Sequence, residues 1–174
     1  MERIPNWLIQ RAHLTPNRLA VTFNGTQLTF LELYEEARRM AGKLAHCGIK
    51  RRTRVAILLN NHINTVILFH ALQLIGCELV PLNIRLHAKE ILFQLKDCEA
   101  ETLITNNLLL EKAKSSGADL PILSIEQIQK EEEAPFEEVR EFSLEDTCTI
   151  MYTSRTTGFP KGVMQSFGNH WWSA

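Results

Sequence analysis

The sequence predicts an α/β fold in which a mainly parallel sheet is flanked by helices. Between residues 54 and 105, short apolar runs alternate with segments of helical periodicity, which is the pattern of crossover units on a parallel sheet. The run RVAILL at 54–59 is almost continuously apolar, as expected for a strand covered on both faces. Capping residues and glycines mark where the helices begin and end.

The N-terminal region is predicted to hold a short helix and a β-hairpin. Asn6 has the side chain of an N-cap, and the helix after it is expected to stop near Pro16. A strand at 19–23 runs into Asn24-Gly25, a strong signal for a tight turn, so residues 27–29 are expected to pair back.

A long helix should begin after Thr29. Glu32 stands three residues further on and completes a capping box with this threonine. Gly48 provides the stop signal. The apolar residues between them follow the helical period: Phe30, Leu33, Ala37, Met40, Ala41 and Leu44.

The remaining elements follow from the same rules. We expect helices at 63–75 and 87–96, strands at 54–59, 78–82, 101–105 and 147–152, and, on weaker signals, a helix at 108–114 and a strand at 121–125. Residues 130–142 are acidic and centred on Pro135, so we interpret them as a solvated surface linker within the domain rather than an interaction tail.

The overall charge excludes a general attraction to nucleic acid. The 174 residues carry 19 basic and 20 acidic side chains, a net charge of −1. The first residues lack the apolar segment of a signal peptide, and no uninterrupted apolar run reaches the about 18 residues of a membrane span. We therefore expect a cytoplasmic protein without a membrane span or a nucleic-acid partner.

Cysteine and histidine give no sign of a metal or redox site. The cysteines at 47, 77, 98 and 148 are widely spaced, without a C-x-x-C pair, and are expected to be small buried apolar residues. The six histidines are isolated from other plausible ligands. No metal-ligating residues are therefore assigned.

The decapeptide TSRTTGFPKG at 153–162 has the composition of a phosphate-binding loop. Phosphate oxygens are bound by backbone N–H groups, short hydroxyls and a cation. The expected strand at 147–152 leads directly into it, which places the loop at a strand end, where α/β sheets bind ligands. Its hydroxyls, glycines and cation are Thr153, Ser154, Thr156, Thr157, Gly158, Lys161 and Gly162.

This loop is not a Walker A sequence, which requires G-x-x-x-x-G-K-(S/T). Instead it resembles the phosphate-binding signature of the AMP-forming acyl-CoA synthetase, luciferase and adenylation-domain superfamily, (S/T)-(S/T)-G-(S/T)-(S/T)-G-x-P-K-G. Only Arg155 departs from the constrained positions. The resemblance extends upstream through LTFLELYEEARRMAGKLAHCGIK, RVAILLNN, ALQLIGCELVPLNIRL and EILFQLKDCEAETLIT.

Within this superfamily, NWLIQRAHLTPNR, PLNIRL and FGNHWWSA are similar to the 2-succinylbenzoate–CoA ligase family of menaquinone biosynthesis. Many superfamily members have H-x-N after the loop, whereas Phe167 stands here in place of that histidine. For His170 two interpretations stay open, a place near the substrate pocket and an ordinary packing role.

The resemblance implies a two-step reaction. A carboxylate attacks Mg-ATP to form an acyl-adenylate and pyrophosphate, and the CoA thiol then displaces AMP. It implies that the ATP β- and γ-phosphates are held by Thr153, Ser154, Thr156, Thr157, Gly158 and Lys161. The resemblance implies ATP, Mg²⁺ and CoA as cofactors and co-substrate, and 2-succinylbenzoate as the carboxylic acid that is joined to CoA. Another AMP-forming acid–CoA ligase and a non-catalytic phosphate-binding remnant are the alternatives.

Two departures within the chain concern single positions. An arginine at 155 loses the freedom of the family glycine, so we expect impaired ATP use; pairing of its guanidinium with phosphate and a solvent-facing side chain are the other interpretations. Arg52-Thr53 replaces a Gly-Asp turn common in the superfamily, with an expected small loss of turn stability.

The third departure is length. By the resemblance, residues 1–174 correspond to the N-terminal portion of the AMP-binding domain, an incomplete fold. The adenine-binding Y-G-x-T-E segment, the ribose-binding aspartate and the C-terminal catalytic-lysine domain are not in this sequence. We therefore expect no adenylation by this chain alone and no catalytic residue within it. We also expect exposed apolar side chains at Met164, Trp171 and Trp172, a frayed C-terminus and self-association.

Overall fold

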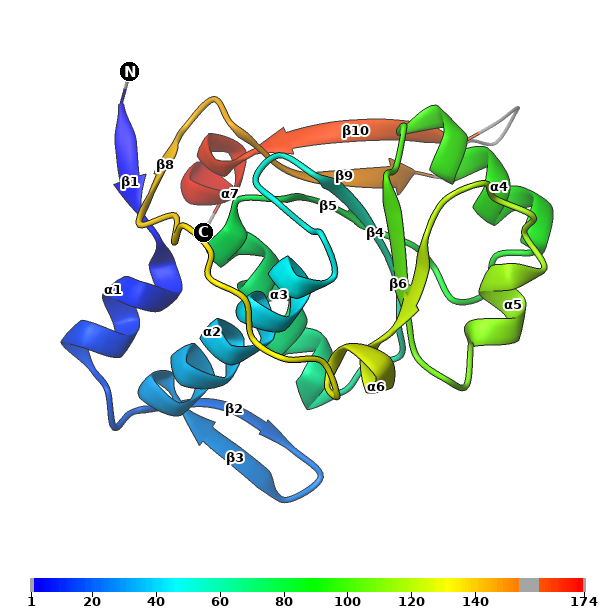
Figure 1. Ribbon diagram of the computed structural model, residues 1–174. Coiled ribbons are helices and arrows are strands. Elements are labelled where there is room, and N and C mark those ends of the chain that lie inside the picture. Colours follow the sequence, from blue (N-terminus) through cyan, green and yellow to red (C-terminus); the bar gives the residue numbers. More distant parts are fainter. Residues whose placement is uncertain (1, 154–159, 174) are drawn as a thin grey trace.

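A computed structural model describes residues 2–153 and 160–173. Within them, the central sheet has six strands in the order β10-β9-β5-β4-β6-β7 (Figure 1). All neighbouring pairs are parallel except β9 and β10, which form an antiparallel hairpin at one edge. The strands are β4 (Arg54–Leu58), β5 (Glu78–Pro81), β6 (Thr102–Thr105), β7 (Ile122–Ser124), β9 (Thr147–Thr153) and β10 (Lys161–Ser166). The predicted α/β class with a mainly parallel sheet is confirmed.

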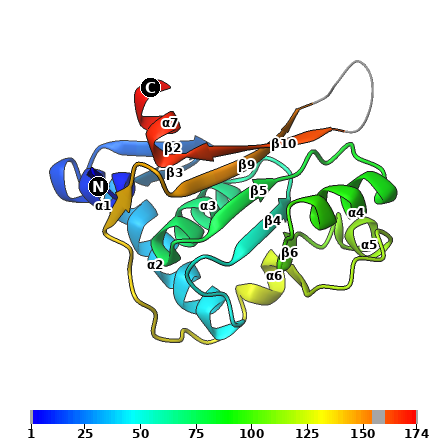
Figure 2. The same ribbon diagram turned by 90° about the horizontal axis from the view of Figure 1, so that it is seen from above.

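Helices cover both faces of this sheet (Figures 1 and 2). Alternate residues of β4 supply the two cores: Val55 and Ile57 join α2 and α3 on one face, and Ala56 and Leu58 join α4 and α5 on the other. The helices are α1 (Trp7–Leu14), α2 (Phe30–His46), α3 (Ile63–Ile75), α4 (Ala88–Asp97), α5 (Leu110–Lys114), α6 (Ile125–Ile128) and α7 (Phe167–Ser173).

The predicted capping signals form the expected contacts. The Asn6 side chain accepts a hydrogen bond from the Leu8 amide at the start of α1. Both bonds of the capping box between Thr29 and Glu32 are present at the start of α2. Gly76 ends α3 in the left-handed region, with φ +86°. Local sequence signals therefore fix these helix boundaries.

Two smaller sheets lie outside the central one. The predicted hairpin is confirmed as β2 (Leu19–Phe23) and β3 (Thr26–Thr29), with the turn residue Asn24 in the left-handed region. β1 (Arg3–Pro5) pairs with β8 (Glu141–Ser143), a contact between the chain's first residues and a much later segment. No sequence pattern predicted this second pair.

Several predicted ends are off by one or two residues, and at one boundary the predicted type of element was wrong. Residue 125 was placed in a strand, but β7 ends at Ser124 and the short helix α6 begins at Ile125. The Ser124 hydroxyl oxygen accepts from the Gln127 backbone amide, and the Gln127 side-chain oxygen accepts from the Ser124 backbone amide. This capping box turns the chain into a helix of one turn, which is too short to show a helical period in the sequence.

The acidic segment 130–142 crosses α2 and α3 on the surface. Its glutamates at 131–133 are exposed, but Val139 is buried and its amide donates to the Leu74 carbonyl at 2.8 Å. The Tyr34 hydroxyl donates to Glu138 at 3.1 Å, which fastens the segment to α2. The segment is therefore tied to the helices by its backbone and by single side chains.

Three cysteines, Cys77, Cys98 and Cys148, are buried as predicted, whereas Cys47 is only partly buried. Burial raises the pKa of Cys77 to about 12 and that of Cys148 to about 11, so both are neutral thiols. The described residues contain no group of three or more potential metal ligands and no helix that is long and apolar enough to cross a membrane.

The turn before β4 carries a strained arginine. Arg52 has φ +67°, a conformation that disfavours side chains with a Cβ atom. Changing Arg52 to glycine should raise the free energy of unfolding by about 0.5–1 kcal/mol, because relief of this strain exceeds the extra chain entropy of glycine. Urea unfolding measures the difference. Arg51→Gly is the matched control. Arg51 is not among the residues with positive φ, so glycine relieves no strain there and should lower the free energy of unfolding.

Candidate functional site

The candidate phosphate loop joins β9 to β10 at the edge of the sheet where the parallel strands end. β9 runs parallel to β5, so its carboxyl end lies at the same edge as the carboxyl ends of β4 and β6 (Figure 1). Ligands of open α/β sheets bind at this edge. The predicted strand leading into the loop and the strand following it are both present.

The two ends of the loop are described and are paired with each other. Thr153 is the last residue of β9 and Lys161 is the first of β10, and they stand opposite each other in the antiparallel ladder. Both side chains are exposed. Within the described residues, Lys161 makes no ion pair, so its ammonium group is free to meet an anion. The predicted site residues Ser154, Thr156, Thr157 and Gly158, and also Arg155, lie outside the described residues.

Tyr152 fastens the carboxyl end of β9 to helix α4. Its hydroxyl lies 2.7 Å from Asp97 Oδ2 and 3.1 Å from the main-chain oxygen of Gln94. Burial and the hydrogen bond to Asp97 raise the pKa of this hydroxyl, so it stays protonated and donates. On β10, a Cβ at Gly162 would lie 3.2 Å from Tyr152 Cζ, which favours glycine there. Sequence reasoning missed Tyr152 and Asp97, because their contact joins distant segments.

Changing Tyr152 to phenylalanine should lower the free energy of unfolding by about 1–2 kcal/mol, because a hydrogen bond to a charged acceptor is lost. Asp97→Asn should lower the free energy of unfolding by a smaller amount, since the oxygen of the asparagine side chain can still accept the hydrogen bond from Tyr152. Urea unfolding of both single variants and of the double variant measures the coupling. Strictly additive effects would show that the pair does not act through this hydrogen bond.

His170 and Phe167 pack where α7 meets the sheet. His170 Nε2 lies 3.0 Å from Thr149 Oγ1, and this threonine hydroxyl lies 3.1 Å from Gln165 Oε1. The Phe167 ring stacks on that of Phe142 with centroids 3.8 Å apart. These contacts give His170 a structural partner on β9, and they place Phe167 in a buried aromatic cluster.

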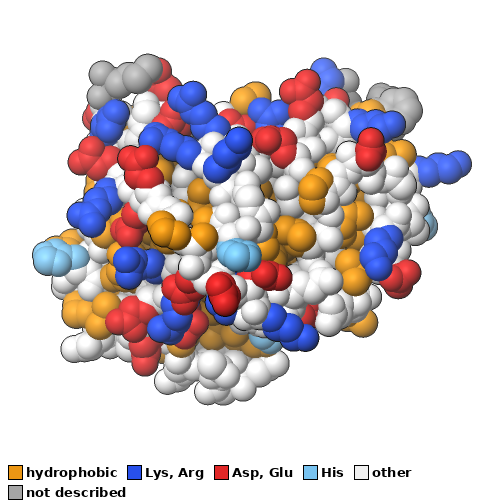
Figure 3. All heavy atoms as spheres, in the orientation of Figure 1, with side chains coloured by type: hydrophobic (Ala, Val, Ile, Leu, Met, Phe, Trp, Pro, Cys, Tyr) orange, Lys and Arg blue, Asp and Glu red, His pale blue; other side chains and the backbone are white. Residues whose placement is uncertain are grey.

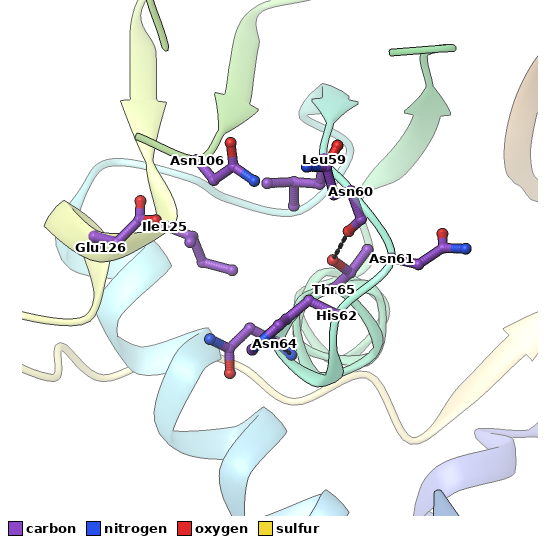
Figure 4. A pocket seen from close by; sticks show the side chains of 9 residues that line it. All are labelled: Leu59, Asn60, Asn61, His62, Asn64, Thr65, Asn106, Ile125 and Glu126. Atoms are coloured by element: carbon purple, nitrogen blue, oxygen red, sulfur yellow. Dashed lines mark hydrogen bonds between the residues drawn. The ribbon is translucent and has the colours of Figure 1, made fainter. Parts of the chain in front are cut away.

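A cavity at the carboxyl edge of the sheet, apart from the candidate phosphate loop, was not predicted from the sequence. A cavity of about 390 Å³ opens at the ends of β4 and β6 (Figure 4). Asn106 directly follows β6, and Asn60 follows β4 after the single residue Leu59; polar residues at these two strand ends are the signal that could have found the cavity. Figure 3 shows basic and acidic side chains interspersed over one face of the molecule, without a large patch of either sign.

The chain is similar to known proteins over nearly all of its length. A family model described as AMP-binding enzyme matches residues 8–174. The 2-succinylbenzoate–CoA ligase of Bacillus cereus strain Q1 is 43% identical over 176 residues, which cover 100% of this chain and 35% of the relative. The chain thus spans about a third of the length of the curated relatives it matches.

Two solved structures of o-succinylbenzoate CoA synthetase from Bacillus subtilis are also similar. One is in complex with the acyl-adenylate intermediate OSB-AMP; it has a TM-score of 0.94 and 38% identity, over 99% of this chain and 35% of that chain. The other is in complex with ATP and magnesium ion; it has a TM-score of 0.92 and 38% identity, over 99% of this chain and 46% of that chain.

Proposed function

Because the chain belongs to the AMP-binding enzyme family, we propose that it is part of an ATP-dependent acid–CoA ligase that activates 2-succinylbenzoate through an acyl-adenylate. The observation that carries this proposal is the pairing of Thr153 with Lys161 at the carboxyl edge of the sheet, with the phosphate-binding signature between them. The similarity to ligases that act on this acid supports the choice of substrate.

In the proposed reaction the carboxylate attacks the α-phosphorus of ATP and pyrophosphate leaves. Both reactants are anions, so catalysis depends on positioning and on neutralising charge. Lys161 supplies a cation, and the loop hydroxyls and backbone amides bind the β- and γ-phosphates. Mg²⁺, entering with ATP, would be coordinated largely by phosphate oxygens and water and would help to neutralise this charge.

Pyrophosphate exchange with 2-succinylbenzoate tests the proposal. A chimera in which this chain replaces the matching first third of the Bacillus cereus ligase should exchange pyrophosphate into ATP with this acid and not with benzoate. Exchange with a different acid only would support another acid–CoA ligase. ATP binding without exchange for any acid would support the non-catalytic phosphate-binding remnant.

Position 155 is tested in the same chimera. Arg155→Gly restores the family residue and should increase the exchange rate. Equal rates with arginine and glycine would contradict the expected impairment. The 174-residue chain assayed alone is the further control, and exchange by it would contradict the expectation that adenylation needs the Y-G-x-T-E segment.

We further propose that the chain self-associates through an apolar surface on β9, β10 and α7. The large exposed side chains on it are Met151, Val163, Met164, Trp171 and Trp172. Trp172 is 75% exposed and Met164 60%, and large exposed apolar side chains favour association. Among the described residues, β10 pairs with a strand on one side only, so its outer backbone edge can also contribute to association.

Sedimentation at several concentrations should show mass increasing with concentration, and Trp172→Gln should reduce this increase. Leu108→Gln is the matched control, because Leu108 is 77% exposed but lies between β6 and α5. A monomer at all concentrations would contradict the proposal, as would an equal effect of the two variants.

A further inference from the structure

The end of the β9–β10 hairpin that carries the phosphate loop lies beyond the pairing of β9 with the rest of the sheet. The parallel register of β5 and β9 joins Leu79 to Thr149, near the start of β9. In the part of the chain that the structure describes, β9 has no later pairing with β5, and β10 pairs with β9 alone. The position of this end of the hairpin therefore depends on side-chain contacts.

Tyr152, the residue before Thr153, makes such a contact with α4. Its hydroxyl donates to Asp97 Oδ2 at 2.7 Å and also lies 3.1 Å from the main-chain oxygen of Gln94. Among the described residues of this half of the hairpin, 150–153 and 160–164, it is the one side chain that hydrogen-bonds to another element. Figure 1 shows the loop end of the hairpin beside α4. Tyr152 therefore fixes this end of β9 to the body of the domain.

The ring of Tyr152 also reaches across to β10. Gly162 stands opposite Tyr152 in the antiparallel ladder. A Cβ at Gly162 would lie 3.2 Å from Tyr152 Cζ and 3.3 Å from its hydroxyl oxygen, so the ring lies over this glycine. The next pair in the ladder is Thr153 and Lys161, the two predicted phosphate-binding residues that the structure describes. One side chain thus joins both strands to α4, one residue away from that pair.

Asp97 is not placed to stabilise its own helix. It is the last residue of α4, where the helix dipole is negative and a second negative charge is unfavourable. Its carboxylate is nevertheless the partner of the short hydrogen bond from Tyr152. A residue that opposes a local preference and makes a specific contact with a distant segment is typical of functional sites. The contact with β9 therefore accounts for the carboxylate at this position.

We propose that Tyr152 is a positioning residue for ATP, which holds Thr153 and Lys161 in place by joining the hairpin to Asp97 on α4. The proposal rests on the function proposed above, because it concerns the same phosphate site. Tyr152 acts through its neighbours and does not contact the nucleotide. Because a misplacement of 1 Å can slow a reaction by about 100-fold, loss of this hydroxyl should impair the use of ATP and leave the use of the acid unchanged.

Tyr152→Phe in the chimera tests the proposal, since it keeps the ring over Gly162 and removes the hydroxyl. In pyrophosphate exchange, the KM for Mg-ATP should rise about tenfold, a part of what a 1 Å misplacement can cost. The KM for 2-succinylbenzoate should stay the same. Asp97→Ala should raise the KM for Mg-ATP as Tyr152→Phe does, and Asp97→Asn should raise it less, because its side-chain oxygen still accepts the hydrogen bond. An unchanged KM for Mg-ATP, or an equal rise for both substrates, would overturn the proposal.

Tyr34→Phe is the matched control. The Tyr34 hydroxyl also donates to a carboxylate, that of Glu138 at 3.1 Å, and is also partly buried. It lies on α2, however, which covers the opposite face of the sheet from α4. This variant should lose a similar amount of stability in urea unfolding and keep the KM for Mg-ATP. An equal rise of this KM in the two tyrosine variants would show a general loss of stability and contradict a positioning role.

Lys161→Ala in the same assay separates this inference from the proposed function. If it raises the KM for Mg-ATP and Tyr152→Phe does not, the positioning role is wrong and the proposed function stands. If neither variant changes this KM, the loop does not hold the phosphates and both are wrong. Calorimetric titration of the 174-residue chain with Mg-ATP repeats the comparison without catalysis, and affinity should fall about tenfold in Tyr152→Phe but not in Tyr34→Phe.

Discussion

Replacing Lys161 with alanine is expected to weaken ATP binding by the chain about 10- to 100-fold, because a charge-assisted contact with phosphate is lost. In the chimera that carries out pyrophosphate exchange, the rate should fall further, by about 10²–10³, since the ammonium also offsets charge that develops in the transition state. Calorimetric titration with Mg-ATP and the exchange assay measure the two effects.

Lys96→Ala is the matched control for this change. Lys96 is exposed on α4 and is not part of the signature, so ATP binding and exchange should be unaffected. Lys161→Arg keeps the charge but alters the geometry of the contact, and an intermediate loss is expected. Unchanged ATP binding in Lys161→Ala would show that Lys161 does not bind the ATP phosphates.

Replacing Leu72 with alanine should lower the free energy of unfolding by about 2–5 kcal/mol. Leu72 is fully buried on α3, in the cluster that joins α2, α3 and one face of the sheet. The loss is a large share of the about 5–15 kcal/mol typical of a folded domain, so thermal or urea unfolding will detect it readily.

Leu14→Ala makes the same chemical change on a helix where the side chain is 61% exposed. It should alter the free energy of unfolding by about 0.5 kcal/mol or less. Similar losses in the two variants would show that α3 is not packed against the sheet as described, since burial is the main difference between the two leucines.

The elements that the sequence predicted well are those with local signals. The Thr29 and Glu32 pair lies within one turn of chain, and α3 from Ile63 to Ile75 matches its predicted range because Gly76 marks its end. α6 was missed because a one-turn helix has no period to detect. The pairing of β1 with β8 was missed because it joins segments far apart in the chain.

The same distinction applies to the sites. Thr153 and Lys161 could be found from one contiguous signature, and the structure places them opposite each other at the ligand-binding edge. The cavity at the ends of β4 and β6 could not, because its lining residues come together only once these two strands are neighbours. Strand order depends on the packing of whole crossover units, and no local sequence pattern encodes it.

Line broadening by Mn²⁺-ATP in the ¹⁵N spectrum of the chain tests the central claim most directly. A paramagnetic ion held by the phosphates should broaden the backbone amide signals of Thr153 and Lys161 first, with little effect on those of β1 or α1 at the other end of the sheet. Broadening centred elsewhere, or none at concentrations that saturate binding, would show that the turn between β9 and β10 does not hold the nucleotide phosphates.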